Sequence, residues 1–188
     1  MRPQLRAHAP LLCAILSAGL LLWPQSGSPA EPGQICDTSH YPLSTPTARF
    51  EDHGDGTVTD KQSKLMWMRC AIGQTWAGGS CIGSPTALTW GSAEEAAQAV
   101  NKRGSFFYSD WRIPQVPELA GIAERQCQDP RINLAVFPHT PAEAFWTATS
   151  RPSSGVEAFA FTLSFGAEGV KYMSKEEKHD VRLVRTAP

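Results

Sequence analysis

The chain lacks the sequence features of several common protein classes. Beyond the first thirty residues there is no long apolar run, so no membrane-spanning helix is predicted in the mature chain. Its 17 lysines and arginines are matched by 18 aspartates and glutamates, which excludes the basic excess expected of a nucleic-acid-binding domain. No CxxC pair is present, so a structural zinc site is disfavoured. We predict no metal and no nucleic-acid partner.

Local catalytic motifs are also missing. The histidines after residue 30 are His40, His53, His139 and His179. None of them stands in a Ser-His-Asp or Cys-His pattern that can be recognised from the neighbouring residues. We therefore predict that the protein is not an enzyme and has no catalytic residues and no cofactor.

The first thirty residues have the three parts of a secretory signal peptide. Arg2 and Arg6 make the N-terminal part positive, and Leu11–Trp23 is an apolar segment too short to span a bilayer comfortably. Ser28 and Ala30 occupy the small-residue positions before a cleavage site, which we expect after Ala30. The alternative is an uncleaved membrane anchor. We predict an exported protein that resides in the periplasm, on the cell surface or outside the cell.

Cysteine usage fits export. Of five cysteines, the predicted signal peptide removes one and leaves Cys36, Cys70, Cys81 and Cys127. An even number of cysteines in an exported chain predicts two disulfides, and four cysteines allow three pairings. We favour Cys70–Cys81, which closes a short glycine-rich loop, and by elimination Cys36–Cys127.

The mature chain is predicted to form one domain after a short extended lead-in. Residues 31–48 are rich in proline, serine and threonine and show no periodicity, whereas residues 49–188 carry strand and helix patterns. Within Arg49–Met68, two strands are expected around the turn at Asp55-Gly56, because Asp-Gly between β-branched residues is a strong hairpin signal.

Two helices are predicted in the middle of the chain. Ser92 and Glu95 form a capping box, alanines and Val100 follow at helical spacing, and Gly104 supplies the stop. The second helix is predicted to begin after Pro114 and to end near Cys127.

The last third of the chain is predicted to be strands. In the segment 156–165, Phe159, Phe161, Leu163 and Phe165 alternate with smaller residues, as in a half-buried strand. The order of hairpin, two helices and antiparallel strands predicts an α+β domain stabilised by disulfides.

The stretch Asp52–Asp60 allows a second interpretation. Aspartates around Asp-Gly are typical of calcium loops, and Asp52, Asp55 and Asp60 would be the ligands. In an EF-hand register, however, His53 would stand at a ligand position, and the bidentate glutamate would be missing. The hairpin turn is therefore the preferred interpretation.

Six stretches together resemble one known family. They are, in order, RFEDHGDGTVTDKQSKLMWMRC (49–70), LTWGSAEEA (88–96), YSDWRIPQVPEL (108–119), INLAVFP (132–138), FWTATS (145–150) and DVRLVR (180–185). Their order and spacing are similar to those of the Lcl C-terminal domain family, named after the C-terminal region of a collagen-like adhesin. The stretch DWRIPQVPEL is also similar to a segment of formylglycine-generating enzymes.

The resemblance implies a C-type-lectin-like α+β fold and, in the best-known member, an adhesive trimeric module that binds sulfated glycosaminoglycans. We therefore expect a secreted, non-catalytic, adhesin-like module that recognises a glycan or surface polymer, with an oligomer left open. One alternative is a structural accessory subunit of an envelope assembly, such as a pilus or secretion apparatus, whose partner would be an envelope protein. The other alternative is a divergent enzyme on the formylglycine-generating-enzyme-like fold.

Candidate ligand-binding residues fall in two places. Trp76 lies inside the predicted disulfide loop, where it could stack on a sugar or fold back as the core of its own loop. Near the C-terminus, a set of basic residues could bind an anionic polymer or form a mixed charged surface with the interleaved acids. That set is Lys171, Lys175, Lys178 and Arg182. The other tryptophans are expected in the core, and Arg112 is expected to pair with Asp110 or Glu118.

Overall fold

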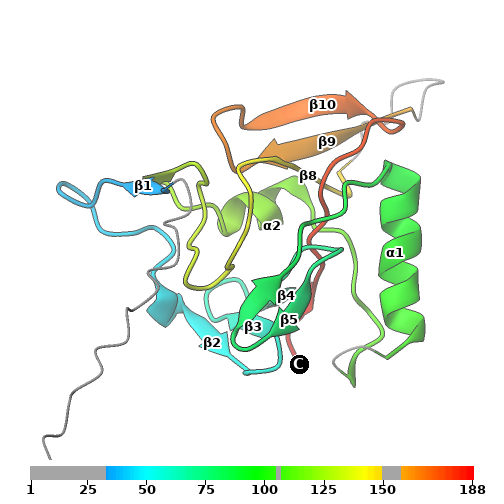
Figure 1. The fold of residues 1–188 in the computed structure, drawn as a ribbon, viewed down its shortest axis with the longest axis horizontal. Helices are drawn as coiled ribbons and strands as arrows, with labels where there is room; N and C mark the ends of the chain where they lie inside the picture. Colours follow the sequence, from blue (N-terminus) through cyan, green and yellow to red (C-terminus); the bar gives the residue numbers. More distant parts are fainter. Residues whose placement is uncertain (1–32, 105–106, 150–157) are drawn as a thin grey trace, which may run out of the picture. The chain divides into compact units, whose positions relative to one another are not determined.

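A computed structural model describes residues 33–104, 107–149 and 158–188 of the protein. The predicted signal peptide lies outside these residues. No helix in the three described ranges is long and apolar enough to cross a membrane. The described part is a mixture of short antiparallel strands and two helices (Figure 1). It is an α+β arrangement, as predicted.

The predicted hairpin opens a four-stranded antiparallel sheet of order β11-β4-β3-β2. Its strands are β2 (Phe50–Asp52), β3 (Thr57–Asp60), β4 (Leu65–Met68) and β11 (Val184–Thr186), and a single 3₁₀ turn, η1 (Thr47–Arg49), precedes it. In the β2–β3 turn, Gly54 and Gly56 have φ values of 76° and 97°, which favour glycine. Asp55 Oδ1 accepts hydrogen bonds from Thr57 N at 2.8 Å and Thr57 Oγ1 at 2.7 Å. The turn interpretation of this stretch is therefore confirmed.

A second, three-stranded antiparallel sheet has the order β10-β9-β8. Its strands are β8 (Ala144–Trp146), β9 (Phe159–Ser164) and β10 (Val170–Ser174). The aromatic row predicted on β9 is buried only at one end. Leu163 and Phe165 are buried, whereas Phe159 is 38% exposed. Phe159 instead stacks on Tyr172 of the edge strand β10, with ring centroids 5.2 Å apart, because at this end of β9 the opposite face, with Ala160 and Thr162, is the buried one.

Two two-stranded ribbons carry the disulfides. They are formed by β1 (Ile35–Cys36) with β7 (Cys127–Gln128), and by β5 (Thr75–Ala77) with β6 (Ser80–Ile82). Cys36 is bonded to Cys127, and Cys70 is bonded to Cys81, which is the pairing that the sequence favoured. The first bridge fastens the N-terminal lead-in to the rest of the domain, since it joins residues 91 positions apart.

Helix α1 (Trp90–Lys102) begins earlier than the sequence predicts. Thr89, rather than Ser92, is the N-cap, and its hydroxyl oxygen accepts from the Ser92 amide at 3.3 Å. The capping box predicted at Ser92 is therefore wrong. Ala93, Ala97 and Val100 form the buried stripe, and Gly104 follows the helix with φ 62°, as predicted.

Helix α2 (Val116–Gly121) is shorter than predicted and ends well before Cys127. Ile122 leaves the helical conformation, with φ −100° and ψ 0°. Glu124 N then donates to Arg131 O at 2.9 Å, so the chain folds back in an extended conformation. This pairing overrides the helical pattern, because the Glu124 amide cannot also donate to the carbonyl four positions earlier, as it would in a continued helix.

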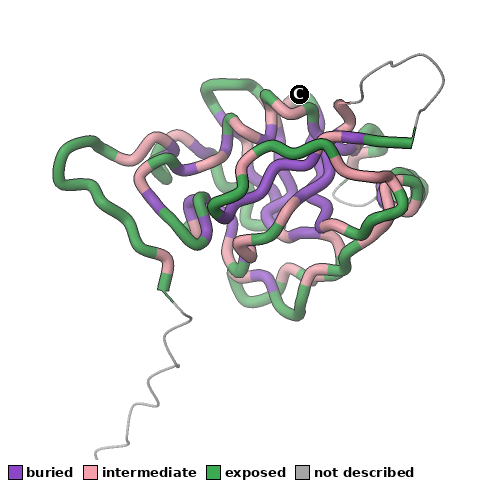
Figure 2. Tube along the Cα trace, turned by 90° about the horizontal axis from the view of Figure 1, so that it is seen from above, coloured by how far each residue is buried: buried purple, intermediate pink, exposed green. Residues whose placement is uncertain are grey.

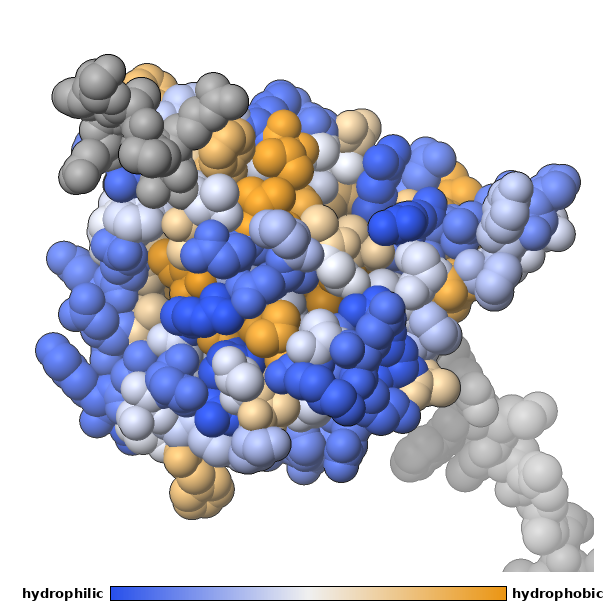
Figure 3. Space-filling model, turned by 180° about the vertical axis from the view of Figure 1, so that it is seen from behind, coloured by the Kyte–Doolittle hydropathy of each residue, from blue (hydrophilic) through white to orange (hydrophobic). Residues whose placement is uncertain are grey.

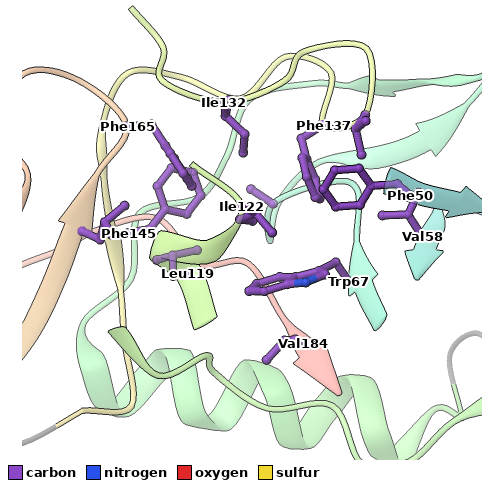
Figure 4. Close-up of a cluster of buried hydrophobic side chains, with 13 residues drawn as sticks. Phe50, Val58, Trp67, Leu119, Ile122, Ile132, Phe137, Phe145, Phe165 and Val184 are labelled. Atoms are coloured by element: carbon purple, nitrogen blue, oxygen red, sulfur yellow. The ribbon is translucent and has the colours of Figure 1, made fainter. Parts of the chain in front are cut away.

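Two buried clusters form the core, and the buried residues lie mainly inside the domain (Figure 2). In the first cluster, Phe50 and Phe137 lie at one end, Phe145 and Phe165 lie at the other, and Ile122 lies between them (Figure 4). In the second cluster, α1 packs on residues of β4. The tryptophans predicted in the core are Trp67, Trp111 and Trp146, which are buried, and Trp90, which packs partly buried against the second cluster. Each large side chain contributes roughly 1.5–3 kcal/mol by burial.

Candidate functional site

Trp76 lies on a small covalently closed hairpin. It is opposite Cys81 in the β5–β6 register, and Cys81 is bonded to Cys70, which follows β4 after Arg69. Gly78 and Gly79 form the tip, with φ values of 59° and 82°. A hairpin closed by a disulfide has little freedom to move relative to β4, so the position of Trp76 is restricted before any ligand binds.

Trp76 also packs on the turn between β2 and β3. A Cβ atom at Gly56 would lie 2.7 Å from Trp76 Cγ, so the close approach requires glycine at this position. The indole Nε1 donates to the carbonyl oxygen of Gly54 at 3.3 Å. The ring is half-buried and rests on a neighbouring turn rather than forming a core within its own loop.

The guanidinium of Arg69 lies over the Trp76 ring, 4.3 Å from the ring centroid. The same group donates to Asp52 Oδ2 at 2.7 Å and to the carbonyl oxygens of Ala135 at 2.9 Å and Val136 at 2.7 Å. Arg69 is only 6% exposed, so these partners hold it firmly. Such a cation–π contact contributes on the order of 1 kcal/mol and fixes the orientation of the ring.

Sequence reasoning did not identify Arg69. The residues that position its guanidinium come from β2, β5 and the segment before Pro138, and no local pattern links these segments. Asp52 was considered as a calcium ligand, and its contact with Arg69 was not foreseen. The role of Arg69 becomes visible only in the tertiary structure.

A cavity of about 200 Å³ lies beside Trp76. Met68 and Val100 contribute to its apolar lining, and Gln74 and Arg103 contribute its long polar side chains. The Gln74 amide is already engaged, since its nitrogen donates to two backbone carbonyls. The exposed Arg103 side chain has no hydrogen bond or ion pair within the described residues. Trp76 and Arg103 are therefore the groups available to a ligand here.

The profile of the Lcl C-terminal domain matches residues 56–185. The chain belongs to the Lcl C-terminal domain family. The family assignment predicted from the six stretches is confirmed, and the match includes the Cys70–Cys81 hairpin and both helices. A search of curated proteins finds no match.

In this Lcl C-terminal domain, the predicted basic set near the C-terminus does not form one site. Lys171 pairs with Glu168 at 2.7 Å, and Lys175 lies over the Trp90 ring, 3.8 Å from its centroid. Lys178 is exposed, and exposed glutamates stand at positions 176 and 177. This region is a surface of mixed charge, and Trp76 packs elsewhere, on the β2–β3 turn.

Arg182 was predicted to bind a ligand, but its side chain is fully buried. Its guanidinium donates to the carbonyl oxygens of Met68 and Arg69 and to Thr140 Oγ1. Burial lowers the pKa of Arg182 to about 9, against the opposing effect of the nearby Asp180 charge. Arg182 therefore holds the core together and is not accessible to a ligand.

The aspartates considered as calcium ligands each have another role. Asp60 pairs with Arg49, and although burial acts to raise the Asp60 pKa, hydrogen bonds from Arg49 and other donors hold it below its ordinary value. Asp52 pairs with Arg69, and Asp55 closes the turn. The described ranges contain no group of three or more acidic, histidine or cysteine side chains that could hold a metal ion.

The surface opposite the view of Figure 1 is mostly hydrophilic, with hydrophobic residues exposed in separate patches (Figure 3). Seven large hydrophobic side chains are exposed in the described chain, and one of them, Ile82, lies on the same β5–β6 hairpin as Trp76. They are Ile35, Tyr41, Ile82, Phe107, Phe159, Val170 and Tyr172.

Proposed function

We propose that this Lcl C-terminal domain is an exported, adhesin-like binding module without catalytic activity, and that it recognises a glycan or another surface polymer. A C-type-lectin-like fold is part of this proposal. Export is supported by the two disulfides, because such bonds persist in oxidising compartments. The adhesin-like role is supported by membership of the family.

The observation that carries the proposal is the fixed, half-exposed indole of Trp76. Its position is set by the Cys70–Cys81 bridge, the Gly56 contact and the Arg69 cation. An aromatic ring that is immobilised before binding offers a flat apolar surface at low entropic cost. Sugar rings have apolar C–H faces suited to such a surface, and the neighbouring Arg103 side chain, which has no partner among the described residues, can bond a hydroxyl or an acidic group.

The substitution Trp76→Ala tests the proposal. Removing the ring should weaken binding of the purified mature chain to its glycan about thirtyfold, since truncating a central aromatic contact costs about 2 kcal/mol. A broad array of glycans and matrix polymers identifies the ligand, and titration calorimetry measures the change in affinity.

Tyr41→Ala is the matched control, because Tyr41 is a 68% exposed aromatic residue far along the chain from the Cys70–Cys81 hairpin. It should leave the affinity unchanged. An array without any signal above background, or equal binding by Trp76→Ala and the parent chain, would contradict the proposal.

A further inference from the structure

A second concavity lies along α1. Its volume is about 440 Å³, and it shares no lining residue with the Trp76 cavity. Glu94, Ala97, Gln98 and Asn101 of α1 form one wall, at the i, i+3, i+4 and i+7 spacing of a single helix face. The other wall is the extended segment 111–115. We call this concavity the α1 groove.

The walls of the α1 groove are fixed by backbone contacts. The Asn101 side chain donates to Trp111 O at 2.9 Å and accepts from Trp111 N at 2.8 Å, so helix and segment are held together. Arg112 N and O both bond Val184 at 2.9 Å, and Ala148 N donates to Pro114 O at 2.7 Å. The groove therefore exists without a ligand, as is usual for small-molecule sites.

The floor of the α1 groove is apolar and its rim is polar. Ala97, Trp111 and Ile113 are at most 6% exposed and form the floor. On the rim, the exposed side chains of Glu94 and Gln98 have no hydrogen bond within the described residues. The rim therefore offers an amide, which both donates and accepts, and a carboxylate, which accepts.

The charge of the α1 groove selects against anions. Arg112 is its only cationic lining residue among those described, and both of its terminal nitrogens are bonded to Glu118 carboxylate oxygens at 2.7 Å. The carboxylate of Glu94 has no partner in the part of the chain that the structure describes. A sulfate, phosphate or carboxylate ligand would meet this charge and would find no free cation.

We infer that the α1 groove binds an uncharged sugar unit of a polysaccharide. Such a ligand combines hydroxyl groups for the Gln98 amide and the Glu94 carboxylate with apolar C–H faces for the floor. This site goes beyond the proposed function, which places the ligand at Trp76, because it assigns an uncharged sugar to a different surface.

The substitution Gln98→Trp tests the inference, because it fills the α1 groove from an exposed helix position. The mature chain is titrated with neutral hexasaccharides of glucose, mannose and N-acetylglucosamine and with an acidic uronate hexasaccharide. At least one neutral hexasaccharide should bind, and Gln98→Trp should weaken it tenfold or more. Ala99→Trp, which places the same bulky side chain at the neighbouring exposed position, should keep the parent affinity.

A second variant, Glu94→Lys, reverses the rim charge and should admit the uronate hexasaccharide. The inference is overturned if no neutral hexasaccharide binds, or if Gln98→Trp binds as the parent does. If only acidic polymers bind, and Trp76→Ala removes that binding, the inference falls and the proposed function stands.

Discussion

At the scale of single residues, Glu124 shows how much a buried charge can depend on neutral donors. Its side chain is fully buried, and no cation pairs with it among the described residues. Ser44 and Thr45 each donate a backbone amide and a hydroxyl to it, at 2.7–2.9 Å, and Gln126 donates its amide at 3.0 Å. Although burial acts to raise its pKa, these donors lower the pKa of Glu124 to about 2. The carboxylate joins the N-terminal lead-in to the centre of the domain.

This geometry predicts an acid-sensitive stability. The pKa of Glu124 is lower in the folded state than its ordinary value of 4.5, so its contribution is complete above pH 4.5 and is lost as the pH falls towards 2. That contribution is about 3 kcal/mol. Urea unfolding between pH 2 and 7 should show the loss. Glu124→Gln should be less stable than the parent at pH 7, because an amide leaves some of the donors unpaired. Below pH 4.5, its free energy of unfolding should depend less on pH than that of the parent.

Glu51→Gln is the control for this experiment. Glu51 is exposed, so the stability of this variant should change with pH as that of the parent does.

Asp180 acts in the opposite sense at higher pH. Burial raises the pKa of Asp180 to about 6, so its effect is to stabilise the fold as the pH falls from 6 towards 4. Glu124→Gln and the parent are therefore compared below pH 4. An equal slope of the free energy of unfolding against pH in that range would refute the role of Glu124.

At the scale of elements, α1 shows how tertiary contacts move a helix boundary. The pattern Ser92-Ala-Glu-Glu95 matches a capping box, yet the helix begins at Trp90. Trp90 N donates to Lys175 O at 3.0 Å, and its ring nitrogen donates to Thr147 O at 3.0 Å. These contacts fix Trp90 in the first turn and supply a partner for an amide that a helix start leaves unpaired.

The position of the cap is tested by two alanine substitutions. Thr89→Ala should lower the free energy of unfolding by about 1 kcal/mol, because the Ser92 amide loses its acceptor. Ser92→Ala should change it by no more than about 0.5 kcal/mol, since no cap depends on the Ser92 hydroxyl. Urea denaturation measures both values, and a larger loss for Ser92→Ala would restore the boundary predicted from the sequence.

At the scale of the whole domain, the two disulfides close loops of very different size. Cys36–Cys127 spans 91 positions, and Cys70–Cys81 spans 11. In the chain-entropy view, a bridge stabilises by restricting the unfolded chain, and the restriction grows with the size of the loop. The longer bridge therefore contributes most to stability, whereas the shorter one positions Trp76.

Non-reducing mass mapping should find no free thiol in the mature protein. The pair Cys36→Ser and Cys127→Ser should cost roughly 2–5 kcal/mol of stability, and more than the pair Cys70→Ser and Cys81→Ser. The second pair should instead reduce glycan affinity more strongly, since it releases the hairpin that carries Trp76. A free thiol at Cys36 or Cys127, or the reverse order of stabilities, would refute this division of roles.

Much of the fold follows from patterns within short segments. The Asp55-Gly56 turn, the stripe of α1 and its stop at Gly104 depend on neighbouring residues only, so the sequence predicts them. The end of α2 at Gly121 is different, because a strand-like contact from Arg131 competes with helix formation. Only the three-dimensional arrangement decides which of the two interactions is made.

The candidate sites divide in the same way. The sequence by itself determines that an aromatic residue, Trp76, stands in a short loop between cysteines of an Lcl C-terminal domain. Only the tertiary structure decides that Arg69 lies over that ring, that Arg182 is buried rather than exposed, and that α1 and the segment 111–115 enclose a groove. The physical reason is range: turns, caps and helical stripes involve residues a few positions apart, whereas burial and the pairing of charges are set by segments that meet only when the chain folds.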